Sequence, residues 1–270
     1  MILILTPTLG ESRFLAETVA SVESLRVQKR HLLVAPADKM ESLKKQFPGC
    51  EVVEDAGREG GLYGALNAGL RAAGTGWSWF TYINDDDVLG RDFERLAQTH
   101  TAGSGLRRIS YGDVAMIDER GRRHGLISVE KSPGRFVPLL HAGVNPVSQL
   151  GMIFGRELLD DVGEFRPDWR LCGDQDFWLR ALKSGYSFNY HAGEAGCFRL
   201  RSGQLSSDAA RMREEMREVT LSHFPDRPPA SEISSAVWRF RLRNAPRRLR
   251  RMLTTGLRSN AAMLSAGRDA

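Results

Sequence analysis

Three adjacent carboxylates, Asp85, Asp86 and Asp87, follow Asn84 at the end of a hydrophobic segment, residues 77–83. Adjacent carboxylates repel one another, so such a cluster is tolerated best when a cation or a set of donors neutralises it. Mg²⁺ and Mn²⁺ bind carboxylate oxygens and keep coordination positions open for phosphate. A metal that bridges a diphosphate stabilises the charge on a leaving group. The alternative is an acidic loop or a helix N-cap, where Asp is also favoured.

The elements before this cluster alternate between strand and helix patterns. We expect strands at 1–6, 31–37, 51–54 and 77–83, and helices at 11–25, 39–46 and 62–73. This order predicts an α/β fold with a largely parallel sheet and helices on both of its faces. Ligands bind outside the carboxyl ends of the strands in such sheets. The acidic cluster lies at such an end, where a ligand site is expected.

The second half of the chain has a mixed pattern. We expect a hairpin formed by 109–117 and 125–129, a helix at 174–184, one or two strands in 186–200 and a charged helix at 208–224. Residues 225–229 are typical of a linker. These patterns predict a main domain over 1–224, divided into halves of about 1–117 and 118–224, and a separate basic helical tail over 225–270.

Composition and charge exclude several classes of protein. The three cysteines are widely spaced and form no CxxC pair, which argues against a disulfide framework or a zinc site and favours the cytoplasm. From Trp238 onward there are nine arginines and one acid, which gives this segment a net charge of +8. Since the whole chain has a net charge of +5, residues 1–237 have a net charge of −3. The main body is therefore mildly acidic, and nucleic acid is not an expected partner.

The tail has an amphipathic pattern. Apolar residues recur at helical spacing, with arginines between them: Trp238, Leu242, Ala245, Leu249, Leu253 and Leu257. Pro246 interrupts the pattern, but Asn244 could cap a new helix with Pro246 in its first turn. A basic amphipathic helix can lie on an anionic membrane surface, which would make the protein peripheral on the inner face of the membrane. The alternative is a solvated helix folded on the main domain.

Five regions in chain order carry motif residues: 6–8 (TPT), 61–89 (GLYGALNAG, then TG, then YINDDDVL), 145–149 (NPVSQ), 173–180 (GDQDFWLR) and 198–206 (FRLRSGQLS). They resemble the segments TPT, GLYDALNKG…TG…LNSDD, MPxxHQ, EDYDLWLR and YRxHxGxxS of glycosyltransferase family 2. The resemblance covers roughly residues 1–206. It implies the GT-A fold, a Rossmann-like sheet flanked by helices, and an inverting glycosyltransferase activity.

Several residues depart from the family pattern. Gly64 stands where the family often has Asp, Gly173 where it has Glu, and Ser148 where it has the His of HQ. Arg201 replaces a His that can complete the metal shell in relatives, so it could instead contact the diphosphate. The segment DDGSxD is also missing after the second strand, where Asp38 is the only acid of the sequence APAD.

The resemblance implies a role for each motif residue. Asp174 is the candidate catalytic base, because a carboxylate can remove the proton of a sugar hydroxyl as it attacks; the alternative is that Asp174 only caps its helix. Asp87 is the favoured ligand of Mn²⁺ or Mg²⁺, Asp85 a ligand or ribose contact, and Asp86 could exchange with either. The nucleotide-sugar contacts are Thr6, Pro7, Thr8, Asp38, Asn67, Asn84, Asp85, Asp86 and Arg201. Residues on the acceptor side, or supporting the site, are Gln149, Asp176 and Trp178; the alternatives are a structural role for Asp176, which is favoured, and a core role for Trp178, also favoured.

The predicted function is transfer of a sugar from a nucleotide diphosphate donor, a UDP-sugar by preference, to a hydroxyl with inversion. The expected acceptor is a glycan or a lipid-linked glycan in cell-surface polysaccharide synthesis, which rests on analogy with the family. One alternative is a degenerate, non-catalytic protein that binds a nucleotide sugar or a membrane. Another is a sugar-phosphate nucleotidyltransferase, but residues 6–10 (TPTLG) lack the basic Gly-rich loop of that class.

Overall fold

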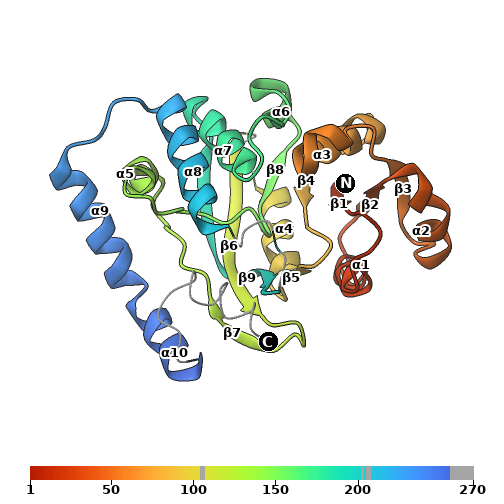
Figure 1. Cartoon of the computed structure of the whole chain (residues 1–270), viewed down its shortest axis with the longest axis horizontal. Helices are drawn as coiled ribbons and strands as arrows, with labels where there is room; N and C mark the ends of the chain where they lie inside the picture. Colours follow the sequence, from red (N-terminus) through yellow and green to blue (C-terminus); the bar gives the residue numbers. More distant parts are fainter. Residues whose placement is uncertain (104–106, 202–203, 205–207, 256–270) are drawn as a thin grey trace.

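The structure is a computed structural model that describes residues 1–103, 107–201, 204 and 208–255. Its centre is a nine-stranded sheet with the order β3-β2-β1-β4-β8-β6-β9-β5, and β7 pairs with β6. Helices cover both faces of this sheet (Figure 1). Most paired residues belong to parallel ladders, and the sheet is mixed α/β as the sequence predicts.

The first half forms the predicted parallel unit. Its strands are β1 (Ile2–Pro7), β2 (Lys29–Ala35), β3 (Glu51–Glu54) and β4 (Trp79–Tyr82), with helices α1 (Leu15–Glu23), α2 (Met40–Gln46) and α3 (Gly61–Ala73) between them. Short 3₁₀ turns η1 (Ala37–Lys39) and η2 (Arg58–Gly60) precede α2 and α3. Because β1, β2 and β4 run parallel, their carboxyl ends meet at one edge of the sheet.

The second half extends the same sheet. Strand β8 (Ile153–Gly155) joins β4 to β6 (Arg108–Ile117) in antiparallel pairs, and β9 (Ser187–Arg199) runs parallel to β6. The predicted hairpin is present as β6 and β7 (Arg123–Leu126), with a bulge at Met116 and Ile117. Strand β5 (Val88–Leu89) pairs with the end of β9, which brings the acidic segment next to residues 197–199.

The helices of this half are α4 (Phe93–Ala102), α5 (Phe136–His141), α6 (Glu157–Val162), α7 (Gly173–Lys183) and α8 (Ala209–His223), with the 3₁₀ turn η3 (Pro133–Arg135) before α5. Helices α7 and α8 were predicted, whereas α4, α5 and α6 were not. The last two have six residues each, which is less than two helical turns and too short for a periodic pattern.

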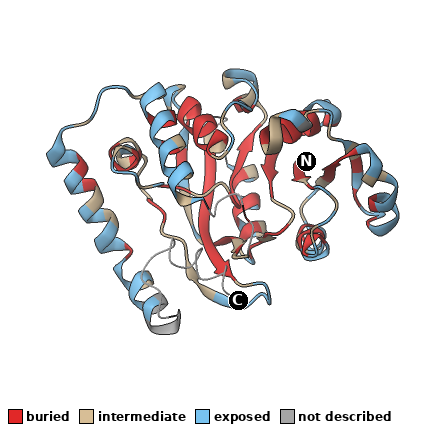
Figure 2. Cartoon of the chain, viewed as in Figure 1, coloured by how far each residue is buried: buried red, intermediate tan, exposed pale blue. Residues whose placement is uncertain are grey.

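The core is largely apolar and lies along the strands, as the buried segments of Figure 2 show. Helix α3 packs close to β1 and β2 through Gly69, where a Cβ would lie 2.7 Å from Val34 Cγ2 and 2.9 Å from Leu5 Cδ1. Phe165 and Phe177 stack with ring centroids 4.4 Å apart, beside the equally buried Phe154. This packing holds the first turn of α7 against the carboxyl edge of the parallel strands.

The tail forms two helices, α9 (Ala230–Arg243) and α10 (Ala245–Thr255). Backbone bonds from Asn244 to Phe240 and from Arg248 to Asn244 carry the helical pattern across the junction. The Asn244 side chain was expected to cap the second helix, but its Nδ2 donates to Phe240 O, 2.9 Å away in the first. Pro246 lies in the first turn of α10, as predicted.

Ion pairs attach the tail to the main body. Arg243 donates to the fully buried Glu130, with Nη1 2.8 Å from Oε1, and Arg247 donates to Asp113 over the same distance. Helix α9 runs beside α5 (Figure 1) and buries only Ile233 and Ala236 from its apolar residues. The tail is therefore folded on the body, mainly through its arginines.

The tail carries an apolar stripe interspersed with exposed arginines. Four large side chains on it are strongly exposed: Trp238 (64%), Leu242 (58%), Leu249 (57%) and Met252 (41%). Of the predicted stripe, the Leu253 side chain and Leu257 lie outside what the structure describes. No helix within the described residues is both long and apolar enough to cross a membrane.

Candidate functional site

The acidic segment begins where β4 ends, and a hydrogen bond from the end of β1 holds its first carboxylate. Thr8 Oγ1 donates to Asp85 Oδ2 over 2.6 Å, and Ser12 Oγ donates to the Asp85 carbonyl over 2.9 Å. Asp85 remains half-buried, and burial is the main reason that its pKa lies above the ordinary value. The predicted residues Thr8 and Asp85 are therefore in direct contact, with Pro7 half-buried beside them.

Asp87 lies deepest of the three acids. Its side chain is fully buried, Oδ1 accepts the Arg199 backbone N–H at 2.9 Å, and Oδ2 accepts Asn84 Nδ2 at 3.2 Å. Burial, followed by the neighbouring charge of Asp86, raises the pKa of Asp87 well above its ordinary value. Both Asp87 oxygens already accept hydrogen bonds inside the fold, and this placement does not support the role of metal ligand that the sequence favoured for Asp87.

Asp86 is paired with the arginine that departs from the family pattern. Arg201 Nε donates to Asp86 Oδ2 over 2.6 Å, and Gln204 Nε2 lies 3.5 Å from the same oxygen. The sequence predicted both Asp86 and Arg201 as donor contacts, and the structure brings them together. The Arg201 side chain is 32% exposed, so it is the more accessible partner of the pair.

Arg199, which the sequence analysis did not single out, holds this segment in place. It is fully buried; Nε donates to Asp86 O at 2.8 Å and Nη2 to Glu17 Oε2 at 2.7 Å. Nη1 donates to Asp118 O at 3.2 Å, and the guanidinium lies 4.3 Å from the centroid of the Phe14 ring. Residue 199 lies in the motif at residues 198–206, but no local sequence pattern indicated that its side chain is buried.

Asp174 begins the predicted helix α7. Its Oδ1 accepts the Tyr63 hydroxyl at 3.3 Å and the Gln175 backbone N–H at 2.8 Å. Burial is the main reason that the pKa of Asp174 rises to about 6. Glu215 of α8 accepts the N–H groups of Leu171 and Cys172 just before this turn. A carboxyl group with a pKa near 6 is ionised at neutral pH and still basic enough to accept a proton.

Tyr82 connects the two acidic regions of the site. It is the last residue of β4, is almost fully buried, and has a pKa raised by burial first and then by the charges of Asp174 and Asp87. Both carboxylates therefore lie within electrostatic range of one hydroxyl. The acidic segment thus lies at the carboxyl edge of the parallel strands, as the topology predicts, and Asp174 affects the same strand end through Tyr82.

A small apolar pocket lies beside Asp174, between α5 and α7. Trp178 lines it together with Phe136, Leu140 and Leu182. Within the part of the chain that the structure describes, Trp178 Nε1 is buried and has no hydrogen-bond partner. The sequence favoured a core role for Trp178 over the acceptor side; the structure buries Trp178 in the core and also places it at this pocket beside Asp174.

Some predicted contacts have structural partners instead. Asn67 donates from Nδ2 to Phe165 O at 2.8 Å and accepts the Phe165 N–H at 3.1 Å, so its amide group binds the backbone of a neighbouring loop. Thr6 is fully buried, and its Oγ1 lies 2.9 Å from His31 Nε2 under the sheet edge. Asp38 is exposed on the turn after β2.

Two residues predicted on the acceptor side or in support of the site, Asp176 and Gln149, differ in their surroundings. Asp176 is fully buried and accepts from Arg180 Nε at 2.9 Å and from His223 Nε2 at 2.8 Å, so it joins α7 to the end of α8. Burial raises its pKa, but these bonds outweigh burial and the pKa is lowered. Gln149 is half-buried, and its Oε1 has no partner among the described residues.

The carboxylates do not form an evident ligand set for a divalent cation. Among the residues that the structure describes, no three His, Cys, Asp or Glu side chains are grouped to hold a metal ion. Asp85, Asp86 and Asp87 each already accept a hydrogen bond from Thr8, Arg201 and Asn84, respectively. The Arg201 guanidinium also places a positive charge on Asp86, where a cation would bind, so this set does not fit a protein-held metal ion.

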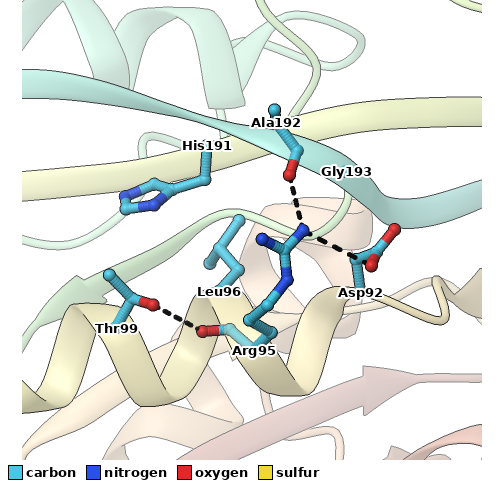
Figure 3. Close-up of a pocket in the computed structure, with 7 residues that line it drawn as sticks. All are labelled: Asp92, Arg95, Leu96, Thr99, His191, Ala192 and Gly193. Carbon is cyan, nitrogen blue, oxygen red and sulfur yellow. Dashed lines mark hydrogen bonds and ion pairs between the residues drawn. The ribbon is translucent and has the colours of Figure 1, made fainter.

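A second pocket, shown in Figure 3, lies between α4 and β9 and is separate from these acids. Its polar groups already have partners within the fold. Arg95 Nη2 donates to Ala192 O at 2.7 Å, and His191 Nε2 lies 3.1 Å from Ser110 Oγ. We therefore assign the candidate site to the edge that carries Asp85 and Asp174.

Comparisons with known proteins identify the fold. No family model matches the chain, and no curated protein sequence does. Among solved structures, residues 1–349 of S. aureus TarS in complex with UDP-GlcNAc match at a TM-score of 0.60 and 15% identity, over 98% of this chain and 79% of that one. The mannosyltransferase PcManGT from Pyrobaculum calidifontis, in complex with GDP-Man and Mn²⁺, matches at 0.58 and 17%, over 99% and 79%.

The longer TarS structure matches at a TM-score of 0.56, and this chain spans 43% of its length. At such identities the likeness establishes the fold alone. The predicted GT-A fold is thus confirmed, whereas membership of glycosyltransferase family 2 stays a prediction.

Proposed function

We propose that this protein is a glycosyltransferase that moves a sugar from a nucleotide diphosphate donor, a UDP-sugar by preference, to a hydroxyl group with inversion. The observation that carries the proposal is the position of Asp174, whose pKa is about 6, across Tyr82 from the acidic segment. Structures of the same fold support it, because they hold UDP-GlcNAc in one case and GDP-Man in another.

The reaction follows from the two sides of this site. The Asp174 carboxylate accepts the proton of the acceptor hydroxyl as that oxygen attacks the anomeric carbon of the donor sugar. The bond between the anomeric carbon and the phosphate oxygen breaks, and the nucleoside diphosphate leaves with the electron pair. One displacement from the opposite side inverts the anomeric configuration. Tyr63 holds the Asp174 carboxylate through a hydrogen bond and so fixes its direction.

The donor side comprises Pro7, Thr8, Asp85, Asp86 and Arg201. Thr8 fixes Asp85 near the end of β1, where a ribose hydroxyl could bind. Asp38, exposed after β2, is the candidate contact for the nucleotide base. We leave out Asn67 and Thr6, since both side chains have partners inside the fold. We also leave out the Mn²⁺ or Mg²⁺ that the sequence predicts, although PcManGT was solved with Mn²⁺.

The test is release of nucleoside diphosphate from a panel of UDP- and GDP-sugars by wild type and by Asp174→Asn. We expect Asp174→Asn to lower turnover by about 10²–10⁴-fold, the usual contribution of a positioned base. Asp226→Asn, at an exposed carboxylate after α8 that has no assigned role, is the matched control and should retain most of the turnover. If wild type and Asp174→Asn bind the donor but neither turns it over, the non-catalytic alternative is the better description.

We further propose that the acceptor is a glycan with a lipid anchor, used in cell-surface polysaccharide synthesis, and that the tail lies on the inner face of the membrane. Exposed Trp238, Leu242 and Leu249 on a helix pair rich in arginine suit an anionic lipid surface. Helix α9 packs against α5, which lines the apolar pocket beside Asp174. The tail surface proposed to contact lipid is thus connected, through α5, to the acceptor side of the site.

Co-sedimentation with vesicles tests the membrane proposal. We expect the full chain to bind vesicles that contain phosphatidylglycerol more strongly than vesicles of phosphatidylcholine alone, with loss of binding at high salt. The double variant Trp238→Ser and Leu249→Ser should release it. Leu221→Ser, at an exposed leucine on α8, is the matched control and should bind as wild type does. Equal sedimentation of the double variant and wild type would refute a lipid role for this face.

A further inference from the structure

The positive charge at the centre of the donor side comes from the chain itself. Arg201 Nε lies 2.6 Å from Asp86 Oδ2, and the buried Arg199 guanidinium binds the Asp86 carbonyl oxygen from below. Two guanidinium groups thus flank one aspartate of the acidic segment. Glu17 neutralises Arg199 through a contact of 2.7 Å, whereas the Arg201 side chain, paired with Asp86, is 32% exposed.

A divalent cation on Asp86 would have to compete with this arrangement. Such ions take six or more oxygen ligands, and in phosphate sites one or two of them are carboxylates. Asp87 is fully buried with both oxygens hydrogen-bonded, and the Oδ2 of Asp86 already accepts from Arg201. A metal on Asp86 would also lie close to the Arg201 guanidinium, and like charges at that separation repel strongly away from bulk water.

A guanidinium can perform the electrostatic part of the cation's role. It offers five N–H donors in one plane, is always charged, and matches phosphate oxygens in a bidentate manner. Asp86 engages the Nε of Arg201 and thereby sets the direction of its plane. A guanidinium held in this way stabilises the negative charge that builds up on the departing diphosphate.

We propose that Arg201, oriented by Asp86, takes the place of the divalent cation, and that this protein binds its nucleotide diphosphate without a metal. The inference rests on the proposed function, because it assumes a nucleotide sugar on this side of the site. It assigns Asp86 a positioning role, and Arg201 the contact with the leaving group.

Calorimetric titration of the full chain with UDP, GDP, CDP and dTDP, in EDTA and in Mn²⁺, tests this inference. We expect one nucleotide to bind with the same Kd, within twofold, in both conditions. Arg201→Gln should weaken that binding at least tenfold in both. Arg213→Gln, at an exposed arginine on α8, is the matched control and should change nothing. Arg201→His should bind weakly in EDTA and recover in Mn²⁺, since His is a metal ligand and frees Asp86.

The outcomes separate this inference from the proposed function. Binding by wild type that needs Mn²⁺ would overturn the role of Arg201 and leave a glycosyltransferase of the ordinary metal-dependent kind. Binding by Arg201→Gln equal to that of wild type would also overturn it. No binding of any of the four nucleotides in either condition would overturn the proposed function, and this inference with it. The comparison of wild type in EDTA and in Mn²⁺ needs no variant, so a failure of Arg201→Gln to fold leaves the test intact.

Discussion

Replacing Arg199 by Met should destabilise the whole protein, because this side chain holds the acidic segment, β9 and the loop after β6 together. The change removes hydrogen bonds to the carbonyl oxygens of Asp86 and Asp118, at 2.8 and 3.2 Å, inside the fold. Each acceptor left without a partner costs about 1–3 kcal/mol. The pair with Glu17 adds little, since that carboxylate is 56% exposed and can be solvated again.

The expected loss in free energy of unfolding is therefore about 2–5 kcal/mol, partly offset by the apolar packing of Met beside Phe14. For a domain of this size, about 2–4 °C of Tm corresponds to each kcal/mol. Thermal unfolding at pH 7.5 should thus show a Tm lower by about 5–15 °C. Arg199→Lys keeps the charge but cannot reach all three acceptors, so its Tm should fall between those of Arg199→Met and wild type.

Arg213→Met, on the exposed face of α8, is the control for the loss of one arginine and should leave Tm unchanged. A Tm within 2 °C of wild type for Arg199→Met would refute the reasoning. That result would mean that the acidic segment is held by its other bonds, from Thr8, Asn84 and the Arg199 backbone.

Three further predictions concern residues at the site and beside it. Since the base acts in its ionised form, kcat/KM should rise with pH through about 6, the pKa of Asp174, and level off above it; a profile that falls over this range would contradict the assignment. The raised pKa of Asp174 also affects stability. The protonated carboxyl favours the folded state below about pH 4, and this contribution to the free energy of unfolding is lost as pH rises to about 6. Asp174→Asn should therefore have a higher Tm than wild type at pH 7.5 and the same Tm at pH 4. Asn67→Ala removes two hydrogen bonds to the Phe165 backbone and should lower the free energy of unfolding by about 2–3 kcal/mol. The KM for the donor should not change. A tenfold rise in that KM would instead show that Asn67 contacts the donor.

The fold could be predicted from the sequence where its signals are local. The alternation of strand and helix patterns over residues 1–83 defines β1 to β4 and their order, because apolar spacing repeats within each element. Strands β5 and β8, with two and three residues, carry no such repeat. They exist because neighbouring strands pair with them, which is a tertiary effect.

The candidate site could be predicted only in part for the same reason. Asp174 and the acidic segment were found from motif positions and the strand ends. Asp176 looks equivalent to Asp174 in the sequence, but two residues along a helix turn the side chain by about 200°, toward Arg180 and His223. Arg199 meets Glu17 across 182 positions of chain, a contact that no local pattern encodes.

The burial of Asp87 has a similar origin. Asp85 and Asp86 carry the same charge in the same stretch of sequence, so the resemblance favoured Asp87 as the ligand without any local signal for its burial. Pairing of β5 with β9 turns Asp87 toward the Arg199 backbone and leaves Asp85 and Asp86 nearer to the surface. The redistribution of roles among these acids is thus a result of strand pairing.

The most direct test of the account is the anomeric configuration of the first sugar released. Proton NMR should follow wild type with UDP-GlcNAc and with GDP-mannose, both α-linked donors, with water as acceptor when no other is supplied. A single displacement with Asp174 as base predicts that the β-anomer appears first, before mutarotation, and that Asp174→Asn releases neither anomer. If the α-anomer appears first, or if Asp174→Asn releases sugar as fast as wild type, the proposed mechanism is contradicted.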